Sequence, residues 1–425
     1  MTRAWRWTTD VVRREVHGSS VIDRALWMAV VAVAAVRLWQ AIPFGGDLRI
    51  IWFAGRHLLD GEPVFADPYF IYLPSSALFA APFGLLPEDV GVGVGAVLGC
   101  LAVIAFAWAC VRLLAAPAPQ WLAPAVALAV LVSHAGGDLI TVANSEFVTL
   151  AMLPFILLAA ARGRWLLFGV LLGVSIAVKP FLLALLALPL LAGRFRALGV
   201  AIAVPVAVSL LALPFVADPG AFFTTTIPNL LRGQEALNNT ANASLANLLE
   251  YVGVPERLAL LLRLLLLATG LTAAFLRWRR PGGDPVVRVV EVGTLLLLAS
   301  SLASSVVWSH YSLLALPVFV IAGRAGSVTG RTAVLWPLLL PVFALGYPAS
   351  MPGVWGTVMV RVGVALVLIL LVLSLRAALS RPAADAPAAA ARTTVAGRTG
   401  GTEAHRTAER GPAGNTAGRR PVRAE

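Results

Sequence analysis

Charged residues are scarce in this chain of 425 residues: they make up 13% of it, against 59% apolar residues. Soluble domains carry about 25% charged residues, so this composition excludes a soluble enzyme domain and predicts an integral membrane protein. Apolar stretches of spanning length recur over residues 25–378. That recurrence excludes a single membrane anchor, and it excludes an outer-membrane barrel, whose short strands alternate in polarity.

Lysine and cysteine are nearly absent. Lys179 is the only lysine among 33 basic residues, and the formal net charge is +12. The arginines stand mostly at the ends of apolar segments, a pattern that sets membrane topology and differs from a basic face that binds nucleic acid. Cys100 and Cys110 lie ten residues apart with neither metal-ligand spacing nor another cysteine. We expect both to be inert, and we expect no nucleic-acid partner.

Several motifs of soluble enzymes are also missing. The chain has no Walker P-loop, no GxGxxG that opens a helix after a strand, no HExxH and no GxSxG. It has no cytoplasmic segment large enough to bind a nucleotide. ATP-driven transport and nucleotide-sugar chemistry are therefore disfavoured, and no metal ligand set is predicted.

The apolar segments predict an all-α polytopic helical bundle of about 12 spans. Thirteen candidates are present, and an odd number cannot leave both termini on one side, so either 71–86 or 121–134 does not cross. Arginines before the first segment place the N-terminus in the cytoplasm, and the later arginines place the C-terminus there too. The thirteen candidate segments are 25–43, 71–86, 91–115, 121–134, 146–161, 165–178, 180–193, 197–216, 256–276, 288–304, 309–323, 332–347 and 356–378.

This topology divides the chain into three parts. Residues 1–24 form a cytoplasmic N-terminal segment, 25–378 the membrane domain, and 379–425 a cytoplasmic tail too poor in apolar bulk to fold. Residues 44–70 and 217–255 are outer loops. The first of these is expected to be structured, because 49–59 is amphipathic enough for a short helix on the membrane surface.

Ionisable groups at the membrane edge are costly and mark candidate functional residues. Asp47 follows two glycines after the first span and is a candidate catalytic base, with a helix N-cap as the alternative. Lys179 precedes a proline between two apolar runs, where an ammonium could bind phosphate or extend to the outer headgroups. Arg263 lies about two turns inside a span and could bind phosphate or pyrophosphate, or pair within the membrane with Glu291 or another acid.

The remaining candidates are polar or aromatic side chains suited to binding sugars. Trp308, His310 and Tyr311 follow one span end, where stacking on a sugar and an interfacial aromatic belt are both reasonable interpretations. The stretch 134–146 adds His134, Asp138, Asn144 and Glu146. The loop 217–255 adds Asn238, Asn239, Asn242, Ser244 and Asn247, for which an ordinary polar loop is the alternative.

Several motifs together resemble a known family. GGD comes after the first span, followed by L-x-x-G-x-P-V-F, D-P-Y-F-I-Y-x-P, A-P-F-G-L-L-P and the A-V-K-P junction. Over roughly 25–375 the chain resembles glycosyltransferase family 87, a branch of the C-type membrane glycosyltransferases, and most closely its arabinosyl members. One position differs: His310 stands where the arabinosyl members have a tyrosine pair, and W-S-H is more typical of members that use polyprenyl-phosphate mannose.

The resemblance implies an arabinofuranose donor linked to decaprenyl phosphate, a cell-envelope glycan acceptor, an extracytoplasmic active site and inversion at the anomeric carbon. It implies Asp47 as general base and Lys179, Arg263 and Arg49 as ligands of the donor phosphate. Sugar and acceptor contacts are expected from a larger set of side chains: His310, Tyr311, Trp308, Tyr72, Asn144, Glu146, Asn239 and Asn242.

No cofactor is required by this chemistry, although a divalent metal stays open. A mannosyltransferase of lipoglycan synthesis is the alternative within the class. A secondary transporter or lipid flippase is the alternative outside it, disfavoured because the halves show no inverted repeat and the polar residues gather on one side. A non-catalytic membrane scaffold is a third alternative.

Overall fold

The computed structural model describes residues 20–114, 118–142, 145–231, 242, 244–280, 283–324 and 326–327. By its internal contacts the chain divides into two units, Met1–Ala378 and Leu379–Glu425. The second unit lies outside the described residues, as do the expected segments 332–347 and 356–378. The description below therefore concerns the first unit.

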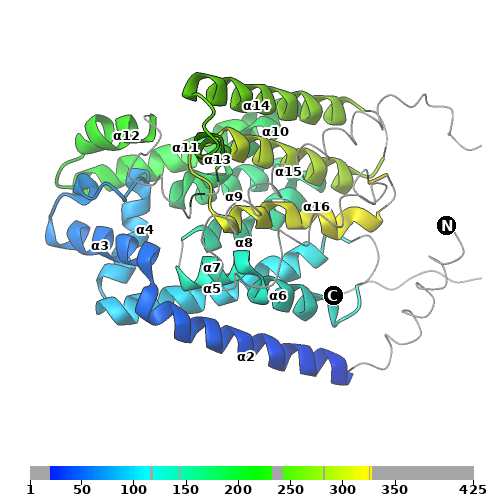
Figure 1. Ribbon diagram of the computed structural model, residues 1–425, viewed down its shortest axis with the longest axis horizontal. Coiled ribbons are helices and arrows are strands. Elements are labelled where there is room, and N and C mark those ends of the chain that lie inside the picture. The colour runs from blue at the N-terminus through cyan, green and yellow to red at the C-terminus, as the bar shows by residue number, and fades with distance from the viewer. Residues whose placement is uncertain are drawn as a thin grey trace, which may run out of the picture. The chain divides into compact units, whose positions relative to one another are not determined.

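The described elements are helices (Figure 1). In chain order they are α2 (Ser20–Phe44), α3 (Gly46–Asp60), η2 (Val64–Ala66), α4 (Pro74–Gly84), α5 (Glu88–Val111), α6 (Leu122–Val132), α7 (His134–Thr141), α8 (Glu146–Ala161), α9 (Trp165–Val178), η3 (Pro180–Leu186), α10 (Ala187–Leu191), α11 (Phe195–Ala212), η4 (Leu213–Phe215), η5 (Phe222–Thr226), α12 (Ile227–Leu231), α13 (Leu245–Tyr251), α14 (Glu256–Arg279), α15 (Pro285–Ala303), η7 (Ser309–Ala315), α16 (Leu316–Val320) and η8 (Ile321–Gly323).

Five of the described helices are long and apolar enough to cross a membrane. They are α2, α5, α11 with η4, α14 and α15. The other apolar helices are shorter, and both α4 and α6 have 11 residues. Eleven helical residues rise about 16 Å, roughly half of a hydrocarbon core. The helical fold is confirmed over the described residues, with five helices able to cross a membrane, whereas the number of about 12 spans stays a prediction.

Helix α15 lies at the centre of the bundle. Of its spanning window 78% is buried, against 11% for α2. It contacts α8, α14, η3 and η7, and α14 lies along its outer side (Figure 1). The largest apolar cluster joins α15 to α5, α8 and α9. A helix that buries nearly all of its surface fixes the position of whatever is attached to its ends.

A second, smaller apolar cluster lies beneath α3. It contains Leu48, Ile51 and Phe65, and it packs α3 against α4 and α5. The buried residues of α3 recur at helical spacing, which is why the stretch expected at 49–59 forms an amphipathic helix. The interpretation of Asp47 as the N-cap is wrong: Gly45, with φ of 29°, precedes the helix, and Asp47 lies in its first turn.

Candidate active site

Glu146 is the centre of a group of polar side chains in the bundle. Its side chain is 1% exposed at the start of α8. Oε1 lies 2.7 Å from Nζ of Lys179 and accepts a hydrogen bond of 3.0 Å from the hydroxyl of Tyr311. Oε2 contacts Nε2 of His310. A buried carboxylate is stable only with such partners, so these contacts fix the four side chains together.

Lys179 lies where the chain leaves α9 and Pro180 prevents the helix from continuing, as predicted. The break leaves carbonyl groups without helical partners, and two serines of α4 supply them. Ser75 donates to the carbonyl of Ala177 at 2.7 Å, and Ser76 donates to that of Val178 at 2.8 Å. These bonds hold α4 against the end of α9. They bring the ring of Tyr72, just before α4, to 5.2 Å from the ammonium.

His310 lies between two carboxylates. Besides Glu146 at Nε2, Oδ2 of Asp138 is 3.5 Å from Nδ1, and the hydroxyl of Ser309 also bonds Asp138. Burial opposes the charge on Asp138, but the bonds from His310 and Ser309 outweigh burial, so the pKa of Asp138 lies below its ordinary value. We call Glu146, Lys179, His310, Tyr311 and Asp138 the Glu146 cluster.

Asp47, in the first turn of α3, interacts electrostatically with charged members of the Glu146 cluster. Its backbone N–H donates to the carbonyl of Val142 at 3.1 Å, which ties the start of α3 to the end of α7. Burial raises the pKa of the half-buried Asp47 carboxyl, and Lys179 and His310 lower it in part. Glu146 and Asp138 raise it further. The result is a carboxyl with a raised pKa, a property common in catalytic acids and bases.

Glycines on α5 make the position of α3 specific. A Cβ at Gly95 would lie 2.0 Å from Cδ2 of Leu48, the residue after Asp47, whereas a Cβ at Gly93 would meet nothing within 4 Å. The close approach at Gly95 would therefore force the buried end of the Leu48 side chain to move if a Cβ were added. It places the first turn of α3 directly on α5.

The arginines expected at the phosphate bind elsewhere in the described structure. Nε of Arg49 is 3.2 Å from the carboxylate of Glu88 at the start of α5. Arg263 donates to the carbonyl of Ala303, in the last turn of α15. The alternative pairing of Arg263 with Glu291 is wrong, because Glu291 is paired with Arg277 at 2.6 Å. The roles of Arg49 and Arg263 at a phosphate stay predictions.

Asn242 is the predicted sugar ligand whose contacts are best defined. Its Nδ2 donates to the carbonyl of Ser305 at 2.9 Å, and its Oδ1 accepts from the N–H of Val307 at 3.1 Å. It thus fixes the backbone that leads from α15 to His310. Asn144 and Asn239 lie outside the described residues.

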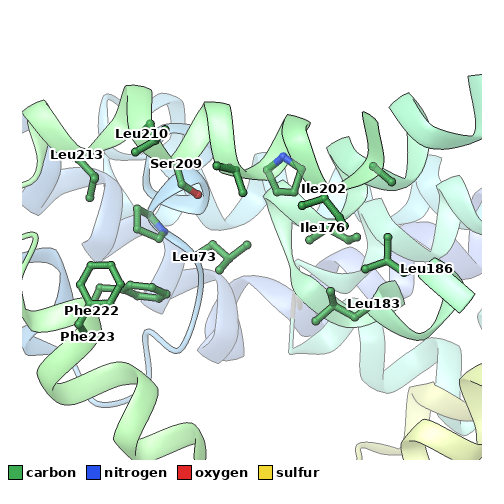
Figure 2. Close-up of a pocket in the computed structure, with 14 residues that line it drawn as sticks. Leu73, Ile176, Leu183, Leu186, Ile202, Ser209, Leu210, Leu213, Phe222 and Phe223 are labelled. Atoms are coloured by element: carbon green, nitrogen blue, oxygen red, sulfur yellow. The ribbon is translucent and has the colours of Figure 1, made fainter. Parts of the chain in front are cut away.

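Two cavities are lined in part by the same two segments of chain, the one around Tyr72 and the one that follows Lys179. One, of about 210 Å³, contains Tyr72, Lys179, Trp308 and Tyr311 in its lining. The other, of about 380 Å³, is almost wholly apolar (Figure 2). Its walls come from 73–74, α9, η3, α11 and η5, with Leu73, Leu183 and Phe222 among the side chains that point into it. A polar and an apolar cavity are therefore neighbours along the same two segments of chain.

No group of three histidine, cysteine, aspartate or glutamate side chains within the described ranges is placed to hold a metal ion. The serines that bind the α9 carbonyls were not predicted as part of the site. Their signal was the pair Ser75-Ser76 directly after Pro74, at a helix start. The sequence alone does not show that α9 packs beside α4, so the role of the two serines could not be predicted from it.

Comparison with known proteins identifies the family of the chain. The model of glycosyltransferase family 87 matches residues 70–301, a range that contains Glu146, Lys179 and Arg263 and excludes Asp47 and His310. The chain is 32% identical over 344 residues, 76% of each chain, to an alpha-(1->3)-arabinofuranosyltransferase of Mycobacterium tuberculosis.

Proteins of the same name from two other organisms are also similar. That of Mycolicibacterium smegmatis is 31% identical over 65% of this chain and 64% of its own. That of Corynebacterium glutamicum is 28% identical over 73% of this chain and 76% of its own. No solved structure matches. The chain belongs to glycosyltransferase family 87, and it is a membrane glycosyltransferase.

Proposed function

We propose that this glycosyltransferase moves arabinofuranose from decaprenyl-phosphate arabinose to a cell-envelope glycan on the outer face of the membrane, with both termini in the cytoplasm. Arabinofuranose is proposed as the sugar because the relatives, which are 28% to 32% identical over most of the chain, are all named alpha-(1->3)-arabinofuranosyltransferase. The neighbouring polar and apolar cavities support a lipid-linked donor.

The apolar cavity suits the prenyl chain of such a donor. Its lining contains leucine, isoleucine, valine and phenylalanine side chains. Leu73 and Leu183 in this lining lie one and two residues along the chain from Tyr72 and Phe181, which line the polar cavity. Burial of a lipid chain there is favourable at about 25 cal/mol for each Å² of apolar surface removed from water. A chain bound in this cavity would bring its phosphate toward Lys179.

Lys179 is proposed to bind the donor phosphate as a point charge. An ammonium is a compact charge with three N–H donors, and that of Lys179 lies in the lining of the polar cavity. Negative charge accumulates on the phosphate as it leaves. Cations fixed by packing stabilise that charge without having to reorganise during the reaction.

Asp47 is proposed to act as general base in a single displacement. The acceptor hydroxyl attacks the anomeric carbon from the face opposite the phosphate, and its proton passes to the Asp47 carboxylate. As the new carbon–oxygen bond forms, the bond from the anomeric carbon to the phosphate oxygen breaks and its electron pair leaves with the phosphate. The configuration inverts, and base assistance of this kind is worth about 10²–10⁴-fold.

A parallel assay tests the proposal. Purified protein in liposomes receives decaprenyl-phosphate arabinose in one reaction and decaprenyl-phosphate mannose in the other, with arabinan and lipoglycan acceptors. Arabinose transfer with an anomeric configuration opposite to that of the donor, read by NMR, is expected. Transfer of mannose alone would favour the mannosyltransferase alternative, which His310 supports, and transfer of neither would contradict the proposal.

A further inference from the structure

The polar cavity, the one of about 210 Å³, has a wall formed by one face of helix α15. None of the binding residues expected from the sequence lies on this face. Leu297, Ser300, Ser301 and Ser304 line the cavity from this helix. Their spacing of three and four residues places them on one side of a helix. Opposite them the cavity is lined by the segment that begins with Lys179.

The hydroxyl groups on this wall differ in their contacts. That of Ser301 donates to the carbonyl of Leu297 at 3.0 Å, and that of Ser304 donates to the carbonyl of Val306 at 2.8 Å. Ser300 is exposed, and its hydroxyl makes no hydrogen bond to the described residues. A ligand in the cavity could therefore bond Ser300 without breaking a bond within the protein.

The wall is held in place from behind. Arg263 binds the carbonyl of Ala303, and Asn242 binds the backbone on both sides of Val306. These two side chains act on backbone groups, so they position the wall and its continuation to Trp308. A binding surface supported in this way keeps its geometry without a bound ligand.

The size and position of the cavity indicate which part of a substrate it holds. A volume of about 210 Å³ equals the share of about seven water molecules in the liquid, enough for a single sugar ring and too small for a lipid chain. Lys179, the proposed phosphate ligand, lies in its lining. A sugar attached to that phosphate would lie directly beside α15.

We propose that the cavity between α15 and the Lys179 segment binds the sugar ring of the lipid-linked donor, with Ser300 hydrogen-bonding a ring hydroxyl and Trp308 contacting a face of the ring. This inference rests on the proposed function, because it requires a donor whose phosphate binds Lys179. Trp308 suits the task, since an indole ring offers a flat apolar surface and one N–H donor.

Two substitutions of Ser300 test the proposal. Ser300→Ala removes one hydrogen bond and should raise the KM for the sugar donor about two- to tenfold with little change in kcat. Ser300→Leu fills the cavity and should raise it more than tenfold. The inhibition constant of decaprenyl phosphate without a sugar should stay at the wild-type value in both variants. Thr269→Ala and Thr269→Leu, on the exposed side of α14, are matched controls expected to behave as wild type.

Three outcomes would overturn the inference. They are Ser300 variants that match the Thr269 controls, weaker inhibition by the sugarless lipid in parallel with the sugar donor, and a raised KM for the acceptor alone, which would place the acceptor in this cavity. Each outcome counts only if the wild-type protein is active in the same assay. Failure of the wild type with either donor would instead contradict the proposed function.

Discussion

The ammonium of Lys179 lies 2.7 Å from Oε1 of Glu146, at the break between α9 and the following turn. Lys179, conspicuous in sequence as the only lysine, is therefore one half of an ion pair with the buried Glu146. A pair of this kind costs desolvation energy to form, and loss of one partner leaves the other charge buried and uncompensated. The pair positions the ammonium for a ligand at the polar cavity.

The first prediction concerns this pair. Glu146→Gln keeps the shape of the side chain but removes the negative charge that Lys179 and His310 contact, so the free energy of unfolding should fall by about 3 kcal/mol or more. Thermal unfolding in detergent micelles measures the change. The double variant Glu146→Gln with Lys179→Met removes both charges and keeps a polar partner for His310 and Tyr311, so it should recover much of the stability and none of the sugar transfer. A single variant that unfolds at the wild-type temperature would contradict the interpretation.

The pH dependence of transfer follows from Asp47. Burial raises its pKa above the ordinary 3.8, and Lys179 and His310 oppose this in part. The carboxylate that accepts the proton is therefore lost as the pH falls through a value above 3.8. The acid limb of kcat/KM should lie above that pH, and in Lys179→Met, measured on residual activity, it should move higher still. An acid limb at or below 3.8 would contradict the assignment of the base.

The same pKa direction has a consequence for stability. A carboxyl whose pKa is higher in the folded state than in the unfolded state favours folding when it is protonated, and that contribution is lost as the pH rises. At neutral pH the ionised Asp47 carboxyl lowers stability. We expect Asp47→Asn to unfold at the wild-type temperature or above it at pH 7. An unfolding temperature below that of wild type would contradict the claim that burial of the ionised carboxyl is unfavourable.

A further prediction concerns the apolar contact between α3 and α5. In Gly95→Ala the new Cβ would overlap the end of the Leu48 side chain, which is buried, and we expect the displaced leucine to push the first turn of α3 and Asp47 with it. A displacement near 1 Å can cost on the order of 10²-fold in rate, so kcat should fall while the KM for the donor changes little. Gly93→Ala, on the same helix with open space around it, is the matched control. Equal kcat for the two variants would show that α3 tolerates the substitution.

Metal removal tests a further expectation. The proposed displacement uses Asp47 and protein cations, so transfer should persist after dialysis against a chelator. Initial rates measured with and without added divalent ions provide the comparison. A rate that disappears on chelation and returns with one ion would require a metal in the reaction.

The sequence predicted helix boundaries well where a glycine or a proline ends a helix. The segments 146–161 and 165–178 coincide with α8 and α9, because Gly163, with φ of 72°, separates them and Pro180 ends the second. The amphipathic stretch at 49–59 became α3. Its cap could not be predicted, since Gly45 and Asp47 are both favourable at a helix start.

Pairing between distant segments could not be predicted from sequence. Glu291 was considered a partner of Arg263, but the packing of α14 on α15 places Arg277 beside it. Likewise, nothing along the chain indicates that Glu146 contacts both Lys179 and His310. Which charged side chains meet depends on how the helices pack together, and hydropathy and charge patterns do not determine that packing.

The most direct measurement is sugar transfer from decaprenyl-phosphate arabinose by wild type, Asp47→Asn and Asp60→Asn in liposomes. Asp60 ends the same helix and pairs with Arg56, so its variant controls for loss of a carboxylate on α3. We predict a loss of about 10²–10⁴-fold in kcat for Asp47→Asn alone, with an unfolding temperature at or above that of wild type. Transfer at the wild-type rate by Asp47→Asn would contradict this prediction.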